Sequence, residues 1–138
     1  MSFEGGILVD REAFTKARAE LGAGFVRILG YFREDGVKSL SALEDAVRAG
    51  NAAAMVIPAH TLKGEARQFG ANPLAALAEK IEDFARTCVE RHEEPSLAVP
   101  DVVALRPLFE STLAYLERDA NPLAVRRPGA GGFGRKAG

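Results

Sequence analysis

The sequence predicts an all-α fold, namely an up-and-down antiparallel four-helix bundle with an additional short N-terminal helix. Apolar residues recur three and four positions apart along most of the chain, which is the spacing of one helix face, and no strand-like alternation of useful length occurs. Short connections separate the last four predicted helices, so consecutive helices should be antiparallel neighbours. With 138 residues and 47% hydrophobic content, the chain has the length of one domain and can bury a core.

Residues 10–20 are predicted to form the first helix, because Asp10 is a favourable N-cap ahead of apolar residues at helical spacing. Two glycines interrupt this pattern before a second helix, which we place at about residues 23–50. Gly36 falls in the middle of the second helix, where we expect a bend.

The third helix is predicted at about residues 51–69, with Asn51 capping its start and Gly70 ending it. Pro58 lies inside this helix, where a proline deletes one backbone hydrogen bond and clashes with the preceding turn. We therefore expect a kink at this proline.

The fourth helix is predicted at about residues 73–91. Asn72 is a favourable N-cap, and Pro73 suits the first helical position. Apolar residues then recur at helical spacing as far as Cys88. This cysteine is the single one in the chain and lies on the apolar side, so we interpret it as a core residue rather than a redox centre.

Asp101 is predicted to open the fifth helix, after a charged loop that contains two prolines. We assign residues 1–118 to one helical-bundle domain. Residues 119–138 are rich in glycine, proline and basic residues and lack apolar periodicity, so we expect them to form a disordered tail.

One face of the third helix gathers residues suited to handling a phosphoryl group. The apolar stripe of this helix lies opposite His60, so the imidazole should be solvent-accessible. Lys63, Gly64 and Arg67 share the face of His60. The glycine leaves room for another molecule to approach, and the two cations would meet the negative charge of a phosphoryl group.

Three further residues border this face. Gln68 is either a hydrogen-bond donor to a phosphoryl oxygen or an ordinary surface residue. Val56 and Ile57 are apolar residues on the exposed side, and next to an acceptor histidine they would form a docking rim for a partner protein. The chain's other histidine, His92, lacks such neighbours, and we assign it a structural role at a helix end.

The sequence His-Thr-Leu-Lys-Gly at residues 60–64, closed by Gly70, resembles the signature of histidine phosphotransfer (HPt) domains. The glycine-containing turn at residues 49–51 and the leucine-rich run after residue 73 also resemble that family, and the similarity covers about residues 8–118. Two positions depart from the pattern, because Glu65 stands where a small residue is usual and Asn51 replaces the commoner aspartate.

The resemblance implies that His60 relays a phosphoryl group between receiver-domain aspartates. It also implies response-regulator receiver domains and a hybrid histidine kinase as partners, with Mg²⁺ held by the receiver and not by this chain. We expect this chain to bind no cofactor and no metal, since two histidines and one cysteine offer no metal-ligand spacing. No ATP-cradling motif occurs, so we expect a phosphoryl carrier rather than an autonomous enzyme.

Composition narrows the classes of binding partner and the cellular compartment that we expect. The net charge of −1 gives no reason to expect binding to nucleic acid or to a membrane surface. No apolar run approaches the length of a membrane span, and a single cysteine fits a reducing compartment. We therefore expect a cytoplasmic monomer.

Two alternative interpretations stay open at this point. The bundle could be a helical adaptor that docks receiver or kinase domains without phosphotransfer, since Glu65 departs from the family pattern. His60 could instead act as a general acid or base in a small enzyme, although the sequence offers no convincing carboxylate partner on the same helix face.

Overall fold

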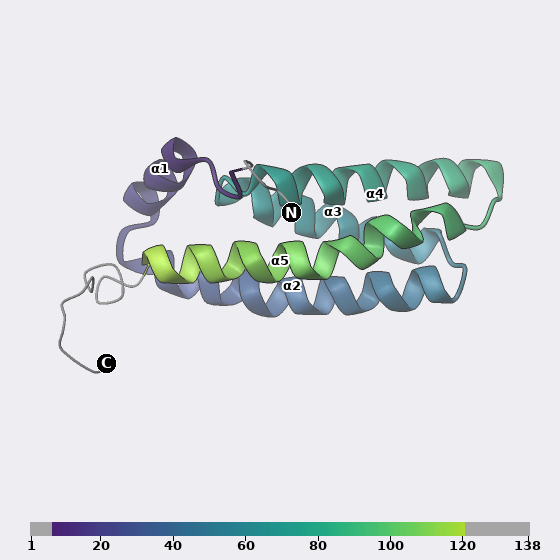
Figure 1. Cartoon of the computed structure of the whole chain (residues 1–138), viewed down its shortest axis with the longest axis horizontal. Helices are drawn as coiled ribbons and strands as arrows, with labels where there is room; N and C mark the ends of the chain where they lie inside the picture. The colour runs from purple at the N-terminus through teal and green to yellow at the C-terminus, as the bar shows by residue number, and fades with distance from the viewer. Residues whose placement is uncertain (1–6, 121–138) are drawn as a thin grey trace.

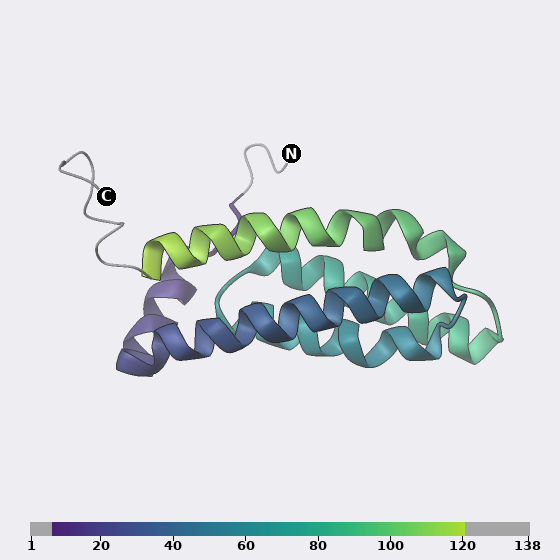
Figure 2. The same ribbon diagram turned by 90° about the horizontal axis from the view of Figure 1, so that it is seen from below.

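The computed structural model describes residues 7–120, and the predicted tail lies outside this range from residue 121 onward. The described helices are α1 (Arg11–Leu21), α2 (Phe25–Arg48), α3 (Ala53–Gln68), α4 (Asn72–Arg91) and α5 (Val99–Ala120), with 3₁₀ turns at Gly22–Gly24 and Ser96–Ala98. The four long helices lie side by side along one axis, and α1 crosses the bundle near the end where α5 finishes (Figure 1, Figure 2). The predicted all-α bundle with an added N-terminal helix is confirmed.

Five phenylalanine rings connect four of the helices inside the core. The rings belong to Phe14, Phe25, Phe32, Phe69 and Phe109, and neighbouring ring centroids lie 5.2 to 5.6 Å apart. Such edge-on and tilted contacts contribute about 0.5–1.5 kcal/mol per pair beyond the area they bury. The rings join α1 and the end of α3 to α2 and α5, so the additional helix is packed as part of the core.

Polar contacts connect α1 to the turn between α3 and α4 and to the C-terminal part of α5. The Asp10 side chain accepts hydrogen bonds from the backbone N–H groups of the first turn of α1, as its N-cap position predicts. The Asp10 N–H donates to the Gly70 carbonyl oxygen at 2.8 Å, and the Arg11 guanidinium donates to the Tyr115 hydroxyl at 2.9 Å and pairs with Asp119. The helix thus bridges the α3–α4 turn and the last turns of α5.

Helices α2 and α3 both run without interruption through the residues at which irregularities were expected. α2 begins only at Phe25, because the preceding glycines form a 3₁₀ turn, and it continues through Gly36. A Cβ atom on this glycine would lie 2.3 Å from Cε1 of Phe109, so close packing explains the glycine. α3 continues through Pro58, and the kink at this proline stays a prediction.

The observed ends of α4 and α5 differ from the expected boundaries. α4 begins at Asn72 itself, with Ala71 as the N-cap and Pro73 at the second position, because the N–H groups of Ala71 and Asn72 are used in the tight turn that closes α3. α5 begins two residues before Asp101, since the 3₁₀ turn leads directly into it, and it extends past the expected domain boundary at residue 118. The N-cap of α3 is Ala52 rather than the expected Asn51, but the Oδ1 of Asn51 still accepts the Ala54 N–H of the first turn at 3.1 Å.

Among residues 7–120, no helix is both long and apolar enough to cross a lipid bilayer. Cys88 is buried, as the apolar stripe of α4 predicts. Burial raises the pKa of its thiol, and a protonated buried thiol is unreactive, which agrees with a packing role.

Glu65 of α3 and Asp35 of α2 form a carboxyl pair at the interface between these two helices. Burial, followed by the hydrogen bond to Asp35 and the charge of that residue, raises the pKa of Glu65 from 4.5 to about 7. The protonated carboxyl of Glu65 therefore donates to Asp35 in mildly acidic solution. Glu65 faces α2, so it lies away from the side of α3 that carries His60.

We expect the free energy of unfolding to fall as the pH rises from about 5 to 8, because folded Glu65 holds its proton up to a pKa of about 7 whereas the unfolded chain releases it near 4.5. The expected loss is about 1–3 kcal/mol. Urea denaturation at both ends of this range measures it. Glu65→Gln cannot ionise and should remove this part of the dependence, whereas Glu79→Gln, in a surface ion pair, should retain it. Equal profiles for the wild type and Glu65→Gln would contradict the assignment.

Candidate functional site

The structure places His60 on the open side of α3. Its side chain is 61% exposed, whereas Met55, Leu62 and Ala66 on the opposite side of the helix are fully buried. The predicted accessibility of the imidazole is therefore confirmed. The apolar residues hold α3 against the bundle, and this packing leaves the imidazole facing solvent.

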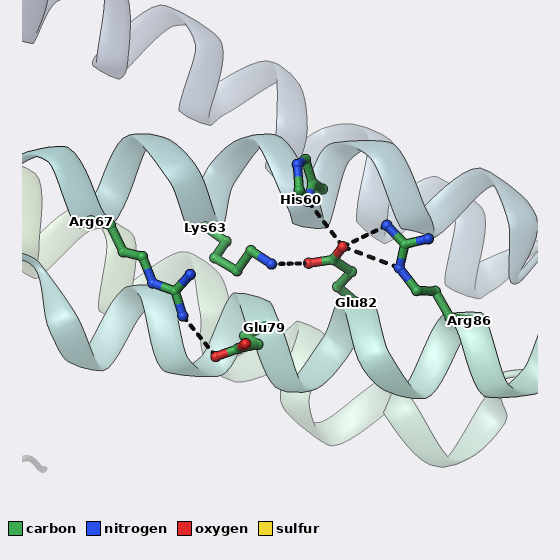
Figure 3. A network of polar contacts seen from close by, with 6 residues as sticks. All are labelled: His60, Lys63, Arg67, Glu79, Glu82 and Arg86. Atoms are coloured by element: carbon green, nitrogen blue, oxygen red, sulfur yellow. Dashed lines mark hydrogen bonds and ion pairs between the residues drawn. The ribbon is translucent and has the colours of Figure 1, made fainter.

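The Glu82 carboxylate of α4 lies beneath this imidazole and is almost completely buried, with 3% of its side chain exposed. The Nδ1 of His60 lies 2.9 Å from Glu82 Oε2, and Lys63 Nζ lies 2.7 Å from Oε1. Arg86 donates to Oε2 from Nη2 at 2.7 Å and from Nε at 3.1 Å. Figure 3 shows the carboxylate between Lys63 and Arg86, with the ring of His60 above it. We call these four residues the Glu82 network.

Two cations keep the Glu82 carboxylate ionised. Burial by itself would raise the pKa of Glu82, but hydrogen bonds from Lys63, Arg86 and His60 outweigh it and lower the pKa to about 2. An ionised carboxylate accepts hydrogen bonds and cannot donate one. The Nδ1 of His60 must therefore carry the proton in this contact, which leaves the lone pair on Nε2 of the neutral ring.

The cations expected beside His60 are both engaged in ion pairs. Lys63 is only 15% exposed because it reaches down to Glu82, and Arg67 pairs with Glu79 of α4 at 2.8 Å. The helical period of α3 assigns both cations to the face of His60, but it could not show that α4 places a carboxylate opposite each of them. The carboxylates of Glu82 and Glu79 thus partly neutralise the positive charge near the imidazole.

The remaining predicted residues lie on α3, before and after His60 along the helix. A Cβ atom on Gly64 would meet nothing within 4 Å, so the surface beside His60 is open on this side. Gln68 is exposed at the C-terminal end of α3. Ile57 is 75% exposed, whereas Val56 is half-buried and packs against the core.

A shallow groove lies between α3 and α4, on the N-terminal side of His60 along α3. Its volume is about 280 Å³, and it is lined by Ala53, Val56, Arg86, Val89 and Glu90. It begins one helical turn from His60 and from Glu82, since Val56 and Arg86 are each four residues away along their own helix. The groove therefore extends the surface beside Val56 from α3 onto α4, and the docking role expected for Val56 and Ile57 stays a prediction.

Glu82 and Arg86 were not singled out as site residues from the sequence. Glu82 sits among Ala78, Ile81 and Ala85, all of which are buried, and a charged residue on an apolar helix face indicates a buried partner. An arginine four residues later is a second signal, because residues at this spacing pair on one helix face. The sequence offers no convincing carboxylate partner on the helix face of His60, and in the structure the partner comes from the neighbouring helix instead.

Within residues 7–120, histidine, cysteine and acidic side chains form no cluster of three or more that could hold a metal ion. The Glu82 network combines one carboxylate with two cations, so it suits an anionic ligand better than a metal ion.

Comparison with known proteins gives two matches. A family model described as the Hpt domain matches residues 27–119, a range that includes the whole Glu82 network. The crystal structure of histidine-containing phosphotransfer protein B from Pseudomonas aeruginosa PAO1 aligns with a TM-score of 0.71 and 21% sequence identity, covering 81% of this chain and 93% of that chain. At this identity the likeness shows a shared fold. A comparison with curated protein sequences returns no match.

Proposed function

The chain belongs to the Hpt domain family, and we propose that His60 accepts a phosphoryl group from the aspartyl phosphate of a response-regulator receiver domain and passes it to another receiver aspartate. Hpt domain proteins are phosphoryl carriers of phosphorelays and interact with receiver domains and kinases. The observation that carries the assignment to His60 is its exposed imidazole, whose Nδ1 donates to a buried carboxylate and whose Nε2 is left as the nucleophile.

The transfer step makes one bond and breaks another. The Nε2 lone pair attacks phosphorus in line with the leaving group, and the phosphorus–oxygen bond breaks so that its electron pair leaves with the aspartate carboxylate. Lys63 and Arg86 lie next to the imidazole and would stabilise the negative charge on the transferring oxygens. Arg67 and Gln68 border the same face and would assist them.

The partner should cover the open surface around His60. Gly64 lets the partner backbone approach the ring, while Val56 and Ile57 provide apolar contacts beside it. The Mg²⁺ ion that phosphoryl transfer uses would be held by acidic residues of the receiver, and the protein would act as a cytoplasmic monomer. A hybrid histidine kinase, which carries a receiver domain, would be the donor.

Phosphoryl transfer from a labelled receiver tests this proposal. A receiver domain phosphorylated with radiolabelled acetyl phosphate is mixed with the protein in the presence of Mg²⁺, and the label is followed by gel electrophoresis. We expect label that is stable in base and labile in acid, as a phosphorus–nitrogen bond requires, and mass spectrometry should locate it on His60. Label on another residue, or none from any of a set of receivers, would contradict the proposal.

A further inference from the structure

The side of the bundle away from His60 carries two ion pairs between α2 and α5. Arg33 of α2 donates from Nε to Oε2 of Glu117 on α5 at 3.0 Å. Farther along α2, Glu44 accepts from Nε of Arg106 on α5 at 2.8 Å. Figure 1 shows α2 and α5 along the lower side of the bundle, and α3 and α4 along the upper side. The two pairs thus lie on the opposite side of the bundle from the Glu82 network.

The same spacing separates the two charges on each helix. Arg33 and Glu44 are eleven residues apart, and so are Arg106 and Glu117. Eleven residues make about three turns, or about 16 Å, so both charges of a helix point in the same direction. The two helices run antiparallel, and each pair joins a positive charge to a negative one. The four charges therefore form a rectangle in which neighbouring corners alternate in sign.

Exposed valines accompany these charges on both helices. Val26 and Val37 lie two turns before and one turn after Arg33, and Val103 lies one turn before Arg106. Their exposed fractions are 64%, 44% and 67% in that order. A single surface valine is ordinary, whereas three of them beside four charges on two adjacent helices give a mixed apolar and charged surface. We call these three valines and four charges the α2–α5 face.

A rectangle of alternating charges is complementary to a second copy of itself. A two-fold axis parallel to the helices would place α2 of one copy against α5 of the other, in the antiparallel sense that the two helices already have within the chain. Arg33 would then meet Glu117 of the second copy, and Glu44 would meet Arg106 of the second copy. A face with charges of one sign would instead repel its own copy. Charge complementarity therefore favours a second copy of this chain as the partner of this face.

We propose that two copies of this chain pair reversibly through the α2–α5 face, with α2 of each copy packed against α5 of the other. Exposed ion pairs add little affinity and mainly fix the orientation, and three valines per copy form a small apolar area. The expected dissociation constant is on the order of 0.1–1 mM. At lower concentration the chain is the monomer that we propose acts in the relay. Pairing leaves His60 exposed in both copies and does not depend on phosphoryl transfer.

Sedimentation of the purified protein from about 20 µM to about 2 mM tests the pairing. We expect the mass of the wild type to rise towards that of a dimer. Val37→Glu places a carboxylate within the face and should raise the dissociation constant at least about 10-fold. Val89→Glu is the matched control, because Val89 is 43% exposed but lies in the groove beside α3, and it should associate like the wild type. Circular dichroism checks the fold. A wild type that stays monomeric, or equal association by Val37→Glu, would overturn the proposal.

A charge-swapped variant tests the orientation of the two copies. Arg33→Glu combined with Glu117→Arg keeps opposite charges together within the chain. Two swapped chains also bring opposite charges together and should pair like the wild type, whereas a swapped chain and a wild-type chain bring like charges together. Nitrogen-15-labelled wild type titrated with unlabelled wild type should show NMR shifts along α2 and α5, and at least about fivefold smaller shifts with the swapped chain. Equal shifts, shifts along α3 and α4, or a swapped chain that no longer pairs with itself would contradict this arrangement.

Discussion

Replacement of His60 by glutamine is expected to abolish phosphoryl uptake from a labelled receiver, with incorporation falling at least about 100-fold, to background. Glutamine approximates the length and polarity of the imidazole but offers no nucleophilic nitrogen, because its amide lone pair is delocalised. The side chain is 61% exposed, and Lys63 and Arg86 still pair with the buried Glu82 carboxylate when the imidazole is replaced, so the bundle should keep its stability. Thermal unfolding followed by circular dichroism checks the fold, and gel autoradiography measures uptake.

The second histidine of the chain provides the matched control. His92 caps the C-terminal end of α4 in a left-handed backbone conformation and is exposed, on a different helix from His60 and outside the Glu82 network. His92→Gln should therefore incorporate label at the wild-type rate. Receiver binding that survives His60→Gln would show that docking and chemistry are separate. Binding by a wild-type protein that takes no label would favour the adaptor function, and label retained in His60→Gln would remove His60 from the mechanism.

The features that sequence predicted well are those set within a single helix. The exposure of His60 follows from the apolar residues on the opposite side of α3. The cap at Asp10 follows from its position just before α1, where its side chain reaches the N–H groups of the first turn. Both depend on contacts between residues at most a few positions apart, which the helical period fixes.

The features that sequence missed depend on contacts between helices. Glu82 is 22 positions from His60, and the pairing of Lys63 with it follows from the way α3 and α4 pack. A helical wheel assigns a residue to a face but does not give the neighbour that this face meets. The role of Gly36 was missed for the same reason, because the ring that requires the glycine belongs to α5.

Gly36→Ala is therefore expected to destabilise the protein by about 1–3 kcal/mol, although alanine is the better helix former by about 1 kcal/mol. The added Cβ would lie 2.3 Å from Cε1 and 2.4 Å from Cζ of Phe109, whose ring is buried and contacts the ring of Phe32. Gly30→Ala is the matched control on the same helix, where a Cβ meets nothing within 4 Å, and it should stabilise by about 0.5–1 kcal/mol. Urea denaturation of both variants gives the comparison.

A double-mutant cycle with Phe109→Leu decides whether the clash causes the loss. Leucine lacks the outer ring atoms that the new Cβ would meet, so the cost of Gly36→Ala should shrink by at least about 1 kcal/mol in that background, even though Phe109→Leu is destabilising by itself. The two changes would then be strongly non-additive. If their costs simply add, or if Gly36→Ala is as stabilising as Gly30→Ala, the helix tolerates a side chain at residue 36, and close packing against Phe109 does not explain the glycine.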